Sequence, residues 1–370
     1  MLRFDRRLLL NFDLVLLGAV LVVALIGLAN LYSSTHLYTN VGVPLYFKEL
    51  TYYLMGAAII LLIISCDYRV LLTLNYPLYA LMILLLLFAL VFGKNISGAQ
   101  RWINLGFFRL QPSEPAKLIL VITLASYYYR KDTGRGFGLL DLAIPALLTG
   151  LPFILIAKQP DLGTGLLLVF VFASMTIFVK LQRTTLATIL CGGLAFIPIG
   201  WKFFLKPYQR QRVETFLNPE NDPLGTGYHI IQSKIAVGSG RIIGKGYLQG
   251  TQGQLDFLPE RHTDFAFSVW AEEWGFLGSF TLIICYFFMI LWGLNIAISA
   301  RDKFGVLLAF GVVSLIFWQA FINLAMVMGL LPVVGVPLPL FSYGGSSLLT
   351  NLAGLGILMN IRMRRFMGTS

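Results

Sequence analysis

The chain has few charged residues for its length. Only 12% of its 370 residues are Asp, Glu, Lys or Arg, whereas 57% are hydrophobic and the mean hydropathy is +0.78. Soluble domains carry about 25% charged residues, so the soluble, disordered and coiled-coil classes are excluded. The apolar residues come in runs of about 20, which match the hydrocarbon thickness of a bilayer. The composition therefore predicts an integral membrane protein.

Cysteine is also scarce. Cys66, Cys191 and Cys285 are an odd number, and each lies inside or beside an apolar run. This pattern excludes a disulfide framework and a cysteine metal cluster. We expect the three side chains to behave as small buried hydrophobic groups.

The apolar runs predict an all-α polytopic membrane protein with about ten transmembrane helices. None of the runs shows the strict alternation of a barrel strand, and a helix satisfies every backbone group in lipid. No linker, low-complexity tract or strong repeat divides the chain, so residues 1–370 are expected to form one domain. The predicted spans lie near residues 12–32, 49–65, 71–92, 112–129, 139–157, 162–179, 185–205, 274–299, 305–331 and 343–361.

The basic residues predict the orientation. Short connections on one side hold most of the Lys and Arg, and that side is the cytoplasm. Both termini are then cytoplasmic, and one large extracytoplasmic loop, about residues 202–273, joins helices 7 and 8. Topology and anionic lipid account for the inner part of the net charge of +11, without nucleic acid. The cytoplasmic basic residues are Arg3, Arg6, Arg7, Arg69, Arg130, Lys131, Arg135, Lys180, Arg183, Arg301, Lys303, Arg362, Arg364 and Arg365.

Ionisable residues at the outer end of the fourth span form the first candidate site. Ser113 followed by Pro115 is a good helix start, which places Glu114 and Lys117 on one helix face at i and i+3. Ionisable groups at membrane depth usually face a cavity or a partner. The pair either lines a polar site, together with Arg101 of the preceding connection, or only fixes helix packing.

A second group of charges lies between spans five and six. Asp161 precedes the apolar run of span six, so it is either a helix N-cap or part of a site. Lys158 has no evident reason to stand at an outer helix end unless an anion binds there. Both residues are therefore candidates for substrate binding.

The long outer connection adds further cations. Arg210, Arg212 and Lys234 are candidates for binding an anionic substrate, and residues 230–237 fit a short amphipathic helix at the interface. The glycines within 238–244 are expected to shape a tight loop at the membrane surface. We reject a dinucleotide site there because no βαβ context surrounds these glycines.

Asp264 is the candidate catalytic base. It stands just before an apolar helical stretch, where the helix dipole favours an ionised carboxylate. An N-cap role would explain this residue alone. It would leave unexplained the neighbouring charged residues Glu260, Arg261, His262, Glu272 and Glu273.

Residues 329–347 are rich in Pro and Gly. Irregular backbone at membrane depth is tolerated where it is buried in protein or lines a cavity. The segment is therefore expected to form a cavity wall, with a plain connecting loop as the alternative.

Four blocks of these residues, in order, resemble the SEDS family of shape, elongation, division and sporulation proteins over essentially the full length. Residues 250–252 and 258–264 are more similar to the elongation branch, RodA, than to the division branch, FtsW. The blocks are Gly98-Ala99-x-Arg101-Trp102-Ile103 with Gln111-Pro112-Ser113-Glu114, Gln159-Pro160-Asp161-Leu162-Gly163-Thr164, His262-Thr263-Asp264-Phe265 through Glu272-Glu273-Trp274-Gly275, and Pro337 through Gly345.

The resemblance implies a peptidoglycan glycosyltransferase in the cytoplasmic (inner) membrane. It would polymerise lipid II, an undecaprenyl-pyrophosphate disaccharide pentapeptide, at the outer leaflet during cell elongation and so maintain cell shape. Its partners would be a class B penicillin-binding protein transpeptidase and the elongation machinery. The family's essential aspartate falls on Asp264, its membrane salt bridge on Glu114 and Lys117, and the aspartate of its Gln-Pro-Asp block on Asp161. Pro115 departs from the larger apolar residue common after the glutamate.

This chemistry needs a groove open to lipid, cations for the pyrophosphate and a base. Asp264 would take the proton of the acceptor hydroxyl in an inverting transfer. No cofactor is required. A divalent cation, Mg²⁺ or Mn²⁺, could share the phosphate charge, and Asp264, Asp161 and Glu114 are the residues that would hold it in this alternative. The alternatives are a lipid II flippase, an FtsW-like division polymerase and a scaffold for the crosslinking enzyme. The substrate-binding candidates are Arg101, Glu114, Lys117, Lys158, Asp161, Arg210, Arg212 and Lys234.

Overall fold

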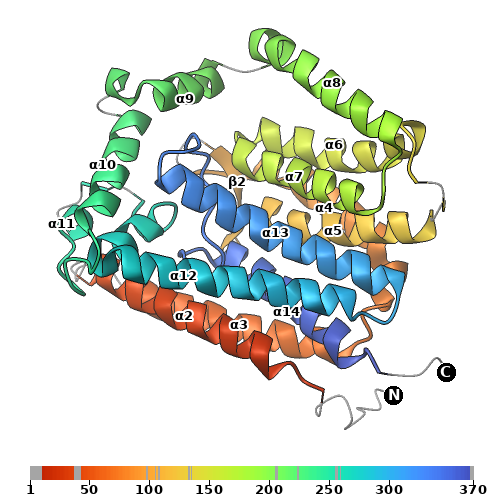
Figure 1. Ribbon diagram of the computed structural model, residues 1–370, viewed down its shortest axis with the longest axis horizontal. Helices are drawn as coiled ribbons and strands as arrows, with labels where there is room; N and C mark the ends of the chain where they lie inside the picture. The colour runs from red at the N-terminus through yellow and green to blue at the C-terminus, as the bar shows by residue number, and fades with distance from the viewer. Residues whose placement is uncertain are drawn as a thin grey trace.

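Long helices lying side by side form the body of the protein in a computed structural model (Figure 1). The structure describes residues 11–36, 43–96, 99–104, 106, 109–131, 134, 136–204, 207–222, 225–254, 257–258 and 260–366. The long helices are α2 (Leu14–Thr35), α3 (Leu45–Ser65), α4 (Val70–Phe92), α5 (Ser113–Arg130), α6 (Ala143–Lys158), α7 (Leu162–Phe178), α8 (Arg183–Ile199), α12 (Ala266–Ile298), α13 (Lys303–Val327) and α14 (Gly345–Met363).

Each of the ten predicted spans coincides with one of these helices. By length and composition, six helical stretches of the described chain can cross a membrane: α2, α3, α4, residues 140–158 with α6, α12 and α13, while α7 is a shorter apolar helix. α5 and α14 are more polar, and most of their residues are buried against other helices, so their polar side chains face protein rather than the outer surface. The prediction of an all-α polytopic membrane protein is confirmed.

The first and last described helices meet at one end of the bundle, here called the terminal end. Nε of Arg362, near the end of α14, lies 3.8 Å from Oδ2 of Asp13, which caps α2. At the same end Arg69 pairs with Asp302 at 2.7 Å. The predicted cytoplasmic residues Arg3, Arg6, Arg7 and Arg135 lie outside the described residues, as do Gly98 and Pro259 of the family blocks.

The opposite end, here called the loop end, carries the irregular part of the chain. A small antiparallel sheet follows α4, with the strand order β1 (Lys94–Ile96), β2 (Ala99–Asn104), β3 (Arg109–Leu110). The predicted loop 202–273 is largely helical, and Figure 1 shows its helices along this end. They are α9 (Pro207–Leu217), α10 (Thr226–Ser239) and α11 (Thr251–Gln254), with a short helical turn at Pro219–Asn221 between α9 and α10. Two further short turns lie at Leu140–Leu142, before α6, and at Gly200–Phe204, after α8.

α10 contains the amphipathic helix predicted at 230–237, but it does more than lie at the interface. Ser233 Oγ hydrogen-bonds the carbonyl of Val327 at 2.7 Å and Oγ of Ser268 at 2.8 Å. Both partners belong to the bundle, one at the end of α13 and the other in the first turn of α12. α10 is therefore fastened to the bundle by buried polar contacts.

The glycine loop after α10 docks on a break in α12. Gly275 interrupts this helix with φ 62°, a conformation that favours glycine. A Cβ on Gly240 would lie 2.0 Å from the carbonyl oxygen of Ala271, and one on Gly244 would lie 2.1 Å from that of Glu273. The expected tight loop is confirmed, and its glycines are needed because two backbones touch.

The cysteines are less buried than expected. Cys66 and Cys191 are exposed, and Cys285 is partly buried. The outer surface of a membrane bundle faces lipid, which is as apolar as the interior, so a small hydrophobic side chain need not be inside. The expectation of burial was wrong because it applied the rule for soluble proteins, whose small hydrophobic side chains are buried away from water.

Candidate active site

Asp264 lies just before α12 at the loop end and is free of the helix-capping role. The cap position of α12 is Phe265, and no side chain caps this helix. The N-cap alternative for Asp264 is therefore wrong. Its side chain is partly buried and faces Gly335, where a Cβ would lie 3.4 Å from Oδ2 of Asp264.

The surroundings of Asp264 raise the pKa of its carboxyl group to about 6. Burial is the largest cause, and the negative charge of Glu260 adds to it. The positive charges of Arg101 and Arg212 lower the pKa, and the negative charge of Asp161 raises it. The carboxylate is thus a stronger base than an ordinary aspartate, yet it is still ionised at neutral pH.

Asp161 both caps a helix and joins a polar cluster. Its Oδ1 accepts a hydrogen bond from the backbone N–H of Thr164 at 3.3 Å, which confirms the N-cap interpretation. Its Oδ2 accepts from Gln111 Nε2 at 2.9 Å and from Ser113 Oγ at 3.2 Å. Nη1 of Arg101 lies 3.7 Å from the same oxygen. The structure therefore brings the first and second groups of polar residues together.

The predicted pair on α5 is formed. Nζ of Lys117 lies 2.7 Å from Oε2 of Glu114, and both side chains are almost fully buried. Ser113, whose hydroxyl contacts Asp161, immediately precedes the pair. The buried pair therefore follows directly on the Asp161 cluster along α5.

The Pro- and Gly-rich segment, residues 329–344, is held by neighbouring elements rather than hanging as a plain loop. Nη1 of Arg212 in α9 donates to the carbonyl of Val333 at 3.2 Å. Gly163 in α7 lies so close to Val334 that a Cβ would be 2.3 Å from its carbonyl oxygen. The segment therefore runs between α7, α9 and Asp264, where a wall of the site was expected.

Three of the predicted cations have other surroundings. Lys158 is the last residue of α6 and has an exposed side chain. Nη2 of Arg210 donates to the carbonyl of Lys202 at 2.8 Å, and the exposed Lys234 lies against Gly329. Their part in substrate binding stays a prediction.

Three of the charged residues near Asp264 in the sequence, Arg261, Glu272 and Glu273, bind neighbouring segments of the chain instead. The buried carboxylate of Glu272 accepts hydrogen bonds from Lys245 Nζ at 2.6 Å and from the backbone N–H of Thr251 at 2.9 Å. Glu273 is bound by the hydroxyl of Ser33, and Nε of Arg261 donates to the carbonyl of Ser34. The interpretation as part of the Asp264 cluster was therefore wrong for Arg261, Glu272 and Glu273, whereas Glu260 does act on the Asp264 carboxyl group.

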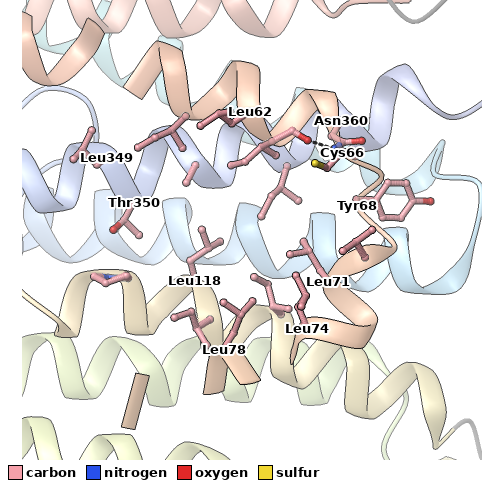
Figure 2. Close-up of a pocket in the computed structure, with 18 of the residues that line it drawn as sticks. Leu62, Cys66, Tyr68, Leu71, Leu74, Leu78, Leu118, Leu349, Thr350 and Asn360 are labelled. Carbon is pink, nitrogen blue, oxygen red and sulfur yellow. Dashed lines mark hydrogen bonds between the residues drawn. The ribbon is translucent and has the colours of Figure 1, made fainter. Parts of the chain in front are cut away.

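An apolar groove runs along the bundle beside this site. Its volume is about 550 Å³, and mainly Leu and Ile side chains of α3, α4, α5 and α14 line it (Figure 2). Leu62 of α3 and Leu74 of α4 are 69% and 43% exposed, so the groove opens sideways between these helices. Ser346, at its loop end, accepts a hydrogen bond from the backbone N–H of Gln111, whose side chain donates to Asp161. Two hydrogen bonds thus connect the groove to the polar cluster.

The donor set does not fit the suggested metal site. Within the described ranges, no three His, Cys, Asp or Glu side chains gather closely enough to hold an ion, and these ranges include Asp264, Asp161 and Glu114. The three carboxylates are spread over the starts of three different helices. We therefore assign no step to a bound cation.

Asn323 of α13 was missed by the sequence reasoning. It is fully buried, and Nδ2 donates to the carbonyl of Asp264 at 2.9 Å and to that of Val336 at 2.8 Å. An amide side chain within an apolar helix is itself a signal, because polar groups at membrane depth need partners. The sequence could not show that the partners are Asp264, the candidate base, and the segment beside it.

Comparison with known proteins fits this geometry. Residues 7–366 match the cell cycle protein family of FtsW, RodA and SpoVE. The chain belongs to this family. The peptidoglycan glycosyltransferase MrdB of Escherichia coli (strain K12) is 47% identical to it over 290 residues, 78% of each chain.

Two solved structures extend the likeness to the fold. A chain from a peptidoglycan synthase complex that coordinates polymerization and crosslinking superposes with a TM-score of 0.83, 34% identity and coverage of 96% of this chain and 99% of that one. The rod shape determining protein RodA of Thermus thermophilus superposes with a TM-score of 0.70, 30% identity and coverage of 96% and 98%. The resemblance to the family and to its RodA branch is confirmed.

Proposed function

We propose that this membrane protein is a peptidoglycan glycosyltransferase that polymerises lipid II at the outer leaflet of the cytoplasmic membrane during cell elongation. The observation that carries the proposal is the carboxylate of Asp264, which does not cap a helix and lies close to the charges of Arg101 and Arg212 at the loop end. The MrdB match, whose name states this activity, supports it.

In the reaction, Asp264 takes the proton from the 4-hydroxyl of the acceptor N-acetylglucosamine. The oxygen attacks the donor anomeric carbon, the bond from that carbon to the pyrophosphate breaks, and undecaprenyl pyrophosphate leaves with inversion. Arg101 and Arg212 face the departing charge, since guanidinium groups can bond two phosphate oxygens at once. General-base help of this kind contributes about 10² to 10⁴ in rate.

The groove between α3, α4, α5 and α14 supplies the place for the prenyl chain. It opens sideways between α3 and α4, so a lipid enters without leaving the bilayer. Its loop end at Ser346 is joined through Gln111 to Asp161, beside Arg101. A lipid seated in the groove therefore has its pyrophosphate next to the polar cluster.

The proposed partner is a class B penicillin-binding protein transpeptidase within the elongation machinery, because the structural match comes from a complex that couples polymerization to crosslinking. The active site is proposed to face the extracytoplasmic side, because the basic residues of the terminal end indicate that this end is cytoplasmic.

The deciding experiment incubates the purified chain with labelled lipid II, with and without the transpeptidase and with a chelator. Glycan chains that depend on this protein support the proposal. A flippase would move labelled lipid II across vesicles without forming chains, and a scaffold would only stimulate crosslinking by its partner. Either result, with no chains from the pure protein or the complex, rejects the polymerase assignment.

The raised pKa of Asp264 predicts the pH dependence. The base works when ionised, so the rate should rise with pH and level off above about pH 6. Glu260→Gln removes a negative charge and should move this rise to lower pH, whereas Arg101→Gln removes a positive charge and should move it to higher pH. The measurement is the initial polymerisation rate between about pH 4.5 and about pH 8, in steps of about 0.5 pH unit. The Glu260 shift should shrink in high salt, because Glu260 is exposed. Shifts of the opposite sign would contradict the assignment of the base.

A further inference from the structure

The geometry points to Asn323 as a positioning residue that holds Asp264 against Gly335 for the reaction. This inference rests on the proposed function, and it concerns a side chain that does not itself reach the reacting atoms. Asn323 is fully buried in α13 and makes two hydrogen bonds, both through Nδ2.

The two acceptors lie on either side of one contact. The first is the main-chain carbonyl of Asp264, at 2.9 Å, and the second is that of Val336, at 2.8 Å. Between them lies the approach of the Asp264 carboxylate to Gly335. One amide group therefore fixes the spacing between the base and the segment facing it.

Gly335 defines the other side of this contact. Its φ of 74° is a conformation that L side chains rarely adopt, and a Cβ there would lie 3.4 Å from Oδ2 of Asp264. Absence of a side chain leaves the carboxylate room beside the backbone. The arrangement fits a base that must approach a sugar hydroxyl at hydrogen-bond distance, where a misplacement of about 1 Å can cost about 10²-fold in rate.

If Asn323 only stabilises the fold, its replacement should change the kinetics differently than if it positions Asp264. Asn323→Ala removes the amide that spans the two carbonyls. If it positions the base, kcat for lipid II polymerisation should fall about 10- to 100-fold in the folded fraction while KM changes less than about threefold. If Asn323 only stabilises the fold, Asn323→Ala should lower the melting temperature and the folded yield but leave kcat per folded molecule unchanged.

Asn75→Ala is the matched control. Asn75 is also a buried asparagine that joins two elements, with Nδ2 donating to Ser126 Oγ at 2.9 Å, but it lies in α4 far along the chain from the site. It should destabilise the protein and leave kcat within about twofold. An equal loss of kcat in both variants, or a normal kcat for Asn323→Ala, overturns the inference.

Two further variants keep the test decisive if Asn323→Ala does not fold. Asn323→Gln keeps the amide but lengthens the side chain by one methylene, so it should fold and show an intermediate kcat. Gly335→Ala disturbs the same contact from the other side and should also lower kcat more than it raises KM. Full activity in both variants rejects the positioning role. A fully active Asp264→Asn variant would reject Asp264 as the base. Loss of activity in Asp264→Asn together with normal kcat in the Asn323 variants would reject only the positioning role of Asn323.

Discussion

Asp264→Asn is expected to abolish glycan-chain formation from purified lipid II, with a loss of at least about 10²-fold in rate and no loss of folding. Asparagine has nearly the shape of aspartate but cannot accept the proton of the attacking hydroxyl. The two hydrogen bonds of Asn323 go to main-chain carbonyls, and the contact with Gly335 depends only on the size of the side chain. Both are therefore kept in the asparagine variant. The measurement is chain length and amount on a gel, at equal concentrations of folded protein.

Thermal unfolding separates this loss from a structural defect. The pKa of Asp264 in the folded state is about 6, above its ordinary value of 3.8, so the folded state binds the proton more tightly than the unfolded chain. The stability that this group contributes is present at low pH and is lost as the pH rises through about 6. Neutral asparagine avoids that loss. The variant should therefore melt no lower than the unmodified protein at pH 7.

Asp141→Asn is the control for this change. Asp141 lies at the start of the turn before α6 and pairs with Lys131 at 2.8 Å, with both side chains partly exposed. Its replacement should leave polymerisation unchanged. Undiminished polymerisation by Asp264→Asn, on the other hand, would remove the proposed base.

The helices were predictable because bilayer thickness sets their length and apolar composition marks them. The predicted spans match α2 to α8 and α12 to α14 within a few residues, except that α12 begins at Ala266 rather than near 274. Gly275 explains the difference, since it breaks the helix with φ 62° at the point where the apolar run begins. Hydropathy locates the membrane part of such a helix, but it does not see the polar helical turns before the break.

The site was predictable in its residue types and only partly in its contacts. Glu114 and Lys117 lie one helical turn apart, so local geometry alone predicted their pairing. The contact of Arg101 with Asp161 and the place of Glu272 depend on how distant segments fold back. Asn323 shows the same limit: its place within an apolar run can be seen in the sequence, but its partners are 59 and 13 residues away.

Lys117→Ala is expected to cause the largest loss of stability. It leaves the carboxylate of Glu114 buried without its partner, and breaking a buried ion pair in this way costs about 3–5 kcal/mol. The measurement is thermal unfolding in detergent, with Lys131→Ala as control. Lys131 also pairs with an aspartate, at 2.8 Å, but its side chain is 38% exposed, and its loss should leave the melting temperature unchanged.

The double variant Glu114→Gln with Lys117→Met decides what the buried pair is for. Removing both charges together leaves no unpaired ion, so stability should return to near that of the unmodified protein. If the pair only fixes the packing of α5, activity should return as well. We expect activity to stay low, because the double variant removes a positive charge about one helical turn from Ser113, which binds Asp161 in the cluster where the pyrophosphate is proposed to bind. A stable and fully active double variant would restrict the pair to packing, and an unchanged melting temperature for Lys117→Ala would show that the buried pair is not an ion pair that the fold needs.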